Sequence, residues 1–155
     1  MPDRLQAELK QSKPFPSPMA EALLSILRTA AVIDHHLAER LKPFGITATQ
    51  YNVLRILRGA GQKGLCGREV AERLVSKVPD VSRLLDRTED LGLIRRERDP
   101  EDRRHVTARI TDKGLAVLEK STPALEAIQR RRFGRLDSEG LQRLIAALED
   151  VRSAL

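Results

Sequence analysis

The sequence is poor in aromatic residues, in cysteine and in long apolar runs. Its 155 residues include no Trp, one Tyr and three Phe, so a core has to be built from aliphatic side chains. A single Cys excludes an intramolecular disulfide and suits a reducing compartment. No apolar run approaches the roughly 20 residues that a membrane-spanning helix needs, and the amino terminus lacks the apolar centre of a signal peptide. We expect a cytoplasmic protein that makes no use of a membrane.

The residues that enzymes and metal sites need are not grouped either. There is no paired nucleophile and base, no cluster of metal ligands and no glycine-rich phosphate loop. His35 and His36 are adjacent, but successive residues on a helix diverge by about 100°, so the pair alone makes no metal site. The sequence predicts a protein that is not an enzyme and has no metal or cofactor.

Charge is abundant. Charged residues make up 32% of the chain, and the formal net charge is +6. A basic balance suits an anionic partner such as nucleic acid, although basic proteins of other classes share it. Within Arg68–Lys113 acidic and basic residues are nearly equal in number, so the position of the charges has to identify the partner.

Helix boundaries follow from caps and apolar spacing. Residues 1–17 carry three of the eight prolines and predict an arm with at most a short helical piece near Arg4–Lys10. Ser17 is a suitable N-cap and Pro18 a suitable first residue for a long helix whose apolar stripe continues to Leu41.

The next two helices are short. Thr47 and Gln50 form the pattern of a capping box, which opens a second helix through Leu57. A third helix is expected to start at Cys66 or Gly67. Its predicted inner face is Val70, Ala71, Leu74 and Val75.

A fourth helix is predicted from Pro79 to Gly92, after a turn at residues 76–78, with one apolar and one polar face. The positions expected inside are Val81, Leu84, Leu85, Thr88 and Leu91. The positions expected outside are Pro79, Ser82, Arg83, Asp86 and Asp90. Two short helices joined by a tight turn, the second polar on one face, make a helix-turn-helix.

Strands are predicted at residues 93–98 and 105–110, around the turn DPEDRR, because the second of them alternates apolar and polar residues. Thr111 can cap a fifth helix, in which Pro123 is expected to cause a kink or a restart with Thr122 as the new N-cap. Asp137 can cap a final amphipathic helix.

The predicted fold class is mainly α with a small β-wing: a winged helix-turn-helix plus N- and C-terminal dimerisation helices. Residues 46–111 form the winged DNA-binding unit, and residues 18–45 and 112–155 form the outer helices. A unit of roughly 65 residues can bury its own core. The apolar faces of the outer helices are therefore expected to pack on each other and on a second copy, which predicts a homodimer.

Four segments resemble the MarR family of bacterial transcriptional regulators. They are GITATQYNVLRIL, VSRLLDRTEDLGLIRR, DPEDRRHVTARIT with the following Asp112, Lys113 and Gly114, and the terminal LDSEGLQRLIAALEDV. The resemblance implies a dimer of winged helix-turn-helix units that binds pseudo-palindromic operator DNA. Many members release DNA when a small, often phenolic, compound binds between the dimerisation and DNA-binding regions, and others respond to oxidation or metal.

The fourth helix is expected to read base edges in the major groove, where arginine and serine can pair with bases. For Asp86 an ion pair with Arg83 or Arg87 is the alternative to base contact. Residues of the second helix and of the turn are placed to contact phosphates. The predicted DNA-binding set is Thr49, Gln50, Lys77, Pro79, Ser82, Arg83, Asp86, Arg87, Arg103 and Arg104.

At the wing tip, one of Arg103 and Arg104 is expected to reach a minor groove, and the other to pair with Asp99, Glu101 or Asp102. The resemblance favours Arg104 as the DNA contact, because of its place in the family's Asp-x-Arg pattern.

An effector pocket is expected between the first helix, the second helix and the start of the fifth. Its predicted polar members are Asp34, His35, His36 and Tyr51, with roles at the surface or at a subunit interface as the alternative.

The leading hypothesis is a homodimeric, sequence-specific transcriptional regulator of operator DNA, a repressor whose operator affinity a small molecule lowers. One alternative is a winged-helix protein-interaction module. Another is a redox-responsive regulator based on Cys66, because a helix start lowers the pKa of a thiol. Relatives that sense peroxide keep their cysteine near the first helix, so the resemblance does not support that role.

Overall fold

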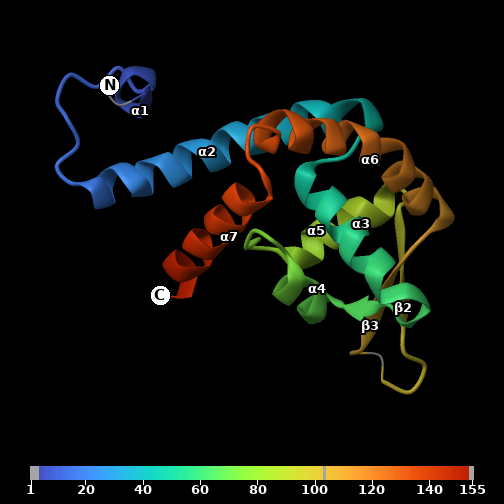
Figure 1. The fold of residues 1–155 in the computed structure, drawn as a ribbon. Coiled ribbons are helices and arrows are strands. Elements are labelled where there is room, and N and C mark those ends of the chain that lie inside the picture. Colours follow the sequence, from blue (N-terminus) through green and yellow to red (C-terminus); the bar gives the residue numbers. More distant parts are fainter. Residues whose placement is uncertain (1–3, 103, 154–155) are drawn as a thin grey trace.

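The computed structural model describes residues 4–102 and 104–153. Helices dominate this part of the chain, and a small antiparallel sheet lies at one end (Figure 1). In chain order the elements are α1 (Arg4–Glu8), α2 (Pro18–Leu41), the 3-10 helix η1 (Lys42–Phe44), α3 (Ala48–Ala60), the 3-10 helix η2 (Gly61–Lys63), β1 (Leu65–Cys66), α4 (Gly67–Arg73), α5 (Val81–Asp90), β2 (Ile94–Arg98), β3 (Val106–Ile110), α6 (Asp112–Phe133) and α7 (Ser138–Ser153).

The sheet has the order β1-β3-β2, and both pairings are antiparallel. Ala108 at the centre of β3 lies between Leu65 of β1 and Arg96 of β2. The predicted mainly α fold with a small β-wing is therefore confirmed, with one addition. Strand β1 was not predicted, because two residues are too few to show the period of a strand.

The core is aliphatic, as the scarcity of aromatic residues predicts. It joins the end of α2, the inner face of α3, the base of the wing and the middle of α6. Its buried members are Leu41, Ile46, Val53, Leu54, Leu57, Leu65, Val70, Leu85, Leu93, Ile94, Ala108, Leu118 and Leu125. The winged unit therefore shares one core with α2 and α6, whereas α7 contributes no buried residue to it.

The predicted helix starts at Ser17 and Thr47 are confirmed. The Ser17 hydroxyl accepts a hydrogen bond from the Ala20 N–H (3.2 Å), with Pro18 as the first helical residue. Thr47 and Gln50 form the reciprocal capping box at α3. Their side chains satisfy N–H groups that a helix start leaves without partners.

Helix α4 is shorter than predicted. It ends at Arg73, and Leu74 already has an extended backbone, so Val75 is 89% exposed and Ala71 also faces solvent. The Val75 N–H donates instead to the side-chain oxygen of Asn52 on α3 (2.9 Å). The inner face predicted for the third helix is thus correct for Val70 and for Leu74, which is half-buried against the core, but wrong for Ala71 and Val75.

Helix α5 begins later than predicted, with Asp80 as its N-cap in place of Pro79 as its first residue. The Asp80 carboxylate accepts a hydrogen bond from the Arg83 N–H (2.9 Å). The helix ends at Asp90, so Leu91 is exposed and not inside. Gly92 follows with φ 72°, the left-handed conformation in which glycine commonly ends a helix.

Helix α6 continues through Pro123 without the restart that was one of the two expected outcomes. Thr122 does not cap a new helix, because its hydroxyl donates to the Leu118 carbonyl oxygen (2.8 Å). The Ser121 hydroxyl donates to the Val117 carbonyl oxygen (2.8 Å). Buried Leu118 and Leu125 anchor the helix on both sides of the proline.

The outer helices keep apolar surface in a single chain. The first half of α2 and all of α7 project from the winged unit (Figure 1). The large apolar residues exposed on them are Met19, Leu23, Leu24, Leu27, Leu144, Ile145 and Val151. Among residues 4–102 and 104–153, none of the helices has the length and apolar character needed to cross a bilayer.

The packing of α6 on the wing predicts opposite effects of two glycine substitutions. A Cβ atom at Gly114 would lie 2.2 Å from the Leu93 carbonyl oxygen, so Gly114→Ala should lower the free energy of unfolding by about 2 kcal/mol. Gly59 in α3 has open space around it, so Gly59→Ala should raise that free energy by up to about 1 kcal/mol. Urea unfolding measures both, and equal effects of the two substitutions would contradict this packing.

Candidate nucleic-acid interface

The exposed face of α5 carries polar and basic side chains, as predicted. Ser82, Arg83, Asp86 and Arg87 are all exposed along it. The opposite face is anchored by buried Leu85 and by Thr88, whose hydroxyl donates to the Leu84 carbonyl oxygen (2.7 Å). The helix therefore presents a firmly held polar ridge.

A hollow of about 840 Å³ lies on one side of this ridge, between α5 and the wing. Ser82 and Asp86 line it from α5, Arg96 and Arg98 from β2, and Arg68 from α4. Arg68 and Arg98 are not in the predicted DNA-binding set. Arg98 could have been found, since it shares one face of a strand with Arg96 two residues earlier.

A second hollow, of about 420 Å³, lies on the other side of the ridge, between α5 and the start of α3. Arg83 and Arg87 line it from α5, and Thr49 lines it from α3. Pro79 borders both hollows. Lys77 is exposed in the turn just before Pro79.

Gln50 also borders the second hollow, but its side chain is held in the helix cap. It is 7% exposed, and its Oε1 accepts a hydrogen bond from the Thr47 N–H (3.0 Å). The Gln50 N–H donates to the Thr47 hydroxyl (3.1 Å). We therefore do not carry Gln50 into the proposed interface, whereas Thr49 remains half-exposed.

Asp86 forms an ion pair, but not with Arg83 or Arg87 as the alternative expectation held. Its partner is Arg96 of the wing, whose guanidinium also pairs with Glu89 (Nη2 to Oε2, 2.9 Å). Burial alone would lower the pKa of Arg96, but the hydrogen bonds that its guanidinium donates to the two carboxylates, and their charges, outweigh burial, so the pKa is raised. A carboxylate held in this way is a poor candidate for base contact.

At the wing tip the pairing expected of one arginine occurs at Arg104. Its backbone N–H and its Nε donate to Asp102 Oδ1 (3.0 and 3.2 Å). These hydrogen bonds, first from the backbone and then from the side chain, lower the pKa of Asp102. Arg104 is nevertheless 92% exposed, so the pair leaves it free to turn outward. Arg103 lies outside the described residues.

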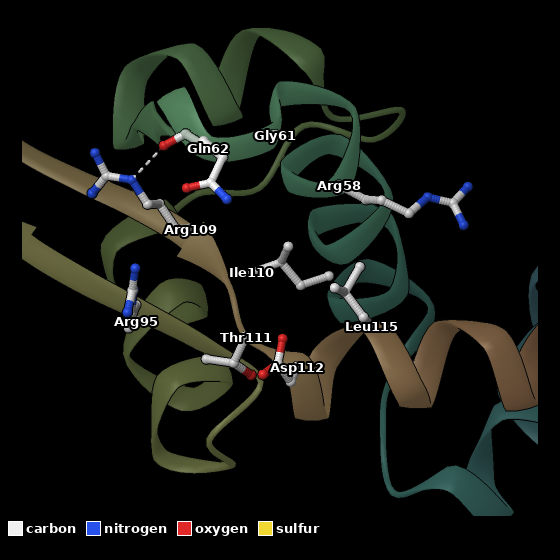
Figure 2. A pocket seen from close by; sticks show the side chains of 9 residues that line it. All are labelled: Arg58, Gly61, Gln62, Arg95, Arg109, Ile110, Thr111, Asp112 and Leu115. Atoms are coloured by element: carbon white, nitrogen blue, oxygen red, sulfur yellow. Dashed lines mark hydrogen bonds between the residues drawn. The ribbon is translucent and has the colours of Figure 1, made fainter.

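Another hollow, of about 410 Å³, lies at the base of the wing, and its basic residues do not converge (Figure 2). Arg109 donates to the Gln62 carbonyl oxygen (2.7 Å) and pairs with Glu97 (2.9 Å). Arg95 also pairs with Glu97 (3.4 Å), and Arg58 extends away from the cavity. Arg109 therefore joins β3 to η2 and β2 and does not form an anion site.

The hollow that best fits the predicted effector pocket, of about 620 Å³, lies between α2, α3, α6 and the α4–α5 turn. Asp34 and Tyr51 line it, as predicted, and Arg55 donates to the Tyr51 hydroxyl (3.4 Å). Helix α6 contributes Leu125 and Gln129 from its second half, not its start.

His35 and His36 do not line this hollow. Their ring centroids are 5.7 Å apart. Partial burial, and then the charge of Arg132, lowers the pKa of His36. In the described part of the chain, no three residues of the types His, Cys, Asp and Glu gather in a way that could hold a metal ion.

Cys66 is the N-cap of α4 and is half-buried. Its N–H donates to Glu69 (2.9 Å), and this backbone hydrogen bond lowers the pKa of the Glu69 carboxyl. Redox regulation through Cys66 stays a prediction.

Comparison with known proteins identifies the family. The sequence profile of the MarR family matches residues 44–105. The HTH-type transcriptional regulator YkoM of Bacillus subtilis is 31% identical over 117 residues, which cover 76% of this chain and 75% of the relative. The HTH-type transcriptional repressor MdtR of the same organism is 31% identical over 121 residues, which cover 78% and 77% of the two chains.

A solved structure agrees in fold. It is that of Sco3205, a MarR family transcriptional regulator from Streptomyces coelicolor, in complex with DNA. The two chains superpose with a TM-score of 0.79 at 25% identity, over 94% of this chain and 92% of that one.

Proposed function

Because the chain belongs to the MarR family of DNA-binding transcriptional regulators, we propose that it acts as a homodimeric repressor whose operator affinity falls when a small molecule binds. The observation that carries the proposal is the polar ridge of α5 with a hollow on each side. The major groove of B-DNA admits a helix and has a phosphate backbone along each edge. A ridge between two hollows is complementary to that shape.

Residues divide between base reading and phosphate contact in this proposal. Ser82, Arg83 and Arg87 read base edges, since they are exposed on the ridge. Asp86 and Gln50 do not, because one is paired with Arg96 and the other is held in the helix cap. The proposed phosphate contacts are Thr49, Lys77, Arg68 and Arg98. Pro79 lies between them, where it borders both hollows.

Arg104 is the proposed contact to the neighbouring minor groove. Narrow stretches of that groove concentrate negative potential and attract arginine. Asp102 accepts a hydrogen bond from the Arg104 backbone N–H (3.0 Å), which fixes the backbone at the wing tip, while the exposed side chain can leave Asp102 to contact DNA.

The dimer is proposed from the apolar surface on α2 and α7. Leu23, Leu27, Ile145 and Val151 are all more than half exposed in one chain. Large exposed apolar patches mark interaction sites, and a second copy carries the same patch in the symmetric arrangement that most homodimers adopt. Two copies would place two α5 helices on one operator.

The repressor assignment is supported by a relative named as a repressor, MdtR of Bacillus subtilis. Repression requires only that the bound dimer occupies its operator.

The effector is proposed to occupy the hollow between α2, α3, α6 and the α4–α5 turn. Leu37, Leu41 and Leu125 supply apolar walls, and Asp34 and Tyr51 supply polar groups. A mostly apolar hollow with a few polar groups suits a small aromatic compound such as a phenolic acid. Binding there would act on DNA through the turn, because Val75 and Ser76 also line the hollow.

Asn52 is the proposed link between effector and DNA. Its side-chain oxygen accepts the hydrogen bond from the Val75 N–H (2.9 Å) at the edge of the hollow. A ligand that competes for Asn52 releases the turn that leads into α5. The position of the recognition helix then becomes less fixed, and operator affinity falls.

The reading of DNA by α5 predicts different roles for Arg83 and Arg104. Arg83→Ala should lower affinity about tenfold or more for the duplex that the wild-type chain selects from a randomised library, and far less for a scrambled duplex. Arg104→Ala should lower affinity for both duplexes and reduce the salt slope by about one. Arg152→Ala on α7 removes the same charge from a helix other than α5 and outside the wing, and serves as control. Unchanged affinity of the Arg83→Ala and Arg104→Ala double variant would refute the assignment.

The proposed link predicts that Asn52→Leu weakens binding to the selected duplex several-fold without ligand, since a hydrogen bond contributes about 1 kcal/mol. Asn52→Asp keeps an acceptor for the Val75 N–H and should retain most of the affinity. The phenolic acid that most raises the wild-type melting temperature should then release DNA from wild type more than from Asn52→Leu. Equal release from both would contradict the link, and a panel in which no phenolic acid stabilises the protein would contradict the effector class.

A further inference from the structure

Arg96 of β2 connects the wing to α5 through its backbone N–H and two nitrogens of its side chain. Its backbone N–H donates to Glu89 Oε1 (2.8 Å), and its Nε donates to Glu89 Oε2 (3.0 Å). Its Nη2 pairs with Asp86, one turn earlier on α5. We call Asp86, Glu89 and Arg96 the Arg96 clamp.

The Arg96 end of the clamp is better shielded than an ordinary surface ion pair, although the Asp86 side chain is 53% exposed. The Arg96 side chain is 22% exposed, and the two carboxylates sit on one face of α5 at a spacing of three residues. A guanidinium is a planar fork that can bridge two carboxylates at once, which a lysine ammonium does with less directional control. Glu89 holds both the backbone and the side chain of Arg96, so β2 cannot shift along α5 without breaking several hydrogen bonds.

The neighbouring Arg95 provides a contrast on the same strand. Its side chain is 63% exposed, lines the hollow at the base of the wing and pairs with Glu97 of its own strand. Because successive side chains of a strand point to opposite faces, Arg95 cannot join β2 to α5. The two arginines carry the same charge but differ in what they hold together.

We propose that Arg96 is a positioning residue for DNA recognition, which fixes the wing relative to α5 so that both can engage one operator at the same time. The proposal rests on the proposed function, in which α5 and the wing contact different grooves. Two contacting elements behave as linked binding modules, and the stiffness of their connection sets the gain from the second contact. If the clamp is loosened, the affinity gained from binding α5 and the wing together is lost on the operator, where the two contacts lie at a fixed distance from each other.

Charge gives the clamp a second consequence at the same place. Asp86 and Arg96 both line the hollow proposed for a DNA backbone, and Glu89 lines it with them. Without Arg96 two carboxylates would face phosphate with no compensating charge, and like charges at short range repel. Arg96 therefore keeps the hollow open to DNA while it holds the wing.

The test compares Arg96→Gln with Arg95→Gln, which removes the same charge from the next residue. Affinities are measured for the duplex selected by wild type and for a scrambled duplex of equal length. We expect Arg96→Gln to reduce the ratio of the two affinities about tenfold, equivalent to about 1.4 kcal/mol, while Arg95→Gln leaves the ratio unchanged. Arg96→Lys should fall between wild type and Arg96→Gln.

A second variant keeps the test decisive if Arg96→Gln folds poorly. Glu89→Gln removes the carboxylate charge that pairs with the Arg96 guanidinium and should reduce the ratio in the same direction, and the double variant should be no worse than either single one. An unchanged ratio in folded Arg96→Gln or Glu89→Gln, as judged by circular dichroism, would overturn the proposal. A wild-type chain that selects no sequence would instead overturn the proposed function.

Discussion

The burial of one face of α5 is the constraint on which the proposed DNA interface depends. Leu85 and Thr88 are buried beneath the helix, so the side chains opposite them have to face outward. Thr88 can be tolerated there because its hydroxyl bonds to the Leu84 carbonyl oxygen, which removes the cost of burying an unpaired polar group. The hollows on both sides of α5, the clamp at Arg96 and the hydrogen bond at Asn52 all locate or hold this one helix.

Sequence reasoning succeeded where the signal is local. Ser17 and Thr47 are typical N-cap residues, so the starts of α2 and α3 could be predicted. The spacing of apolar residues predicts the inner face of α5 almost completely. It failed where the cause lies elsewhere in the chain. The end of α4 depends on an acceptor 23 residues before Val75, and the partner of Asp86 is an arginine ten residues later on a strand. A helical wheel shows that Asp86 points outward but cannot show which residue it pairs with.

The proposed DNA interface and the proposed effector hollow occupy neighbouring but distinct parts of the fold. The proposed effector hollow shares Thr49 with the hollow beside α5, and it shares the α4–α5 turn with the recognition helix. The outer helices α2 and α6 form its other walls, and α2 also carries the apolar surface proposed for a second copy. A ligand in this hollow would therefore contact the α4–α5 turn, which orients α5. It would also contact α2, which in the proposed dimer sets the distance between the two α5 helices. Small shifts there can change whether two helices fit successive major grooves.

The central claim is that paired α5 helices read two successive major grooves. Hydroxyl-radical footprinting of the selected duplex, with the protein-to-DNA ratio determined at saturation, tests it most directly. The account predicts two equivalent protected regions centred about 10 base pairs apart, and two chains bound per duplex. Protection of a single region by one chain would contradict it.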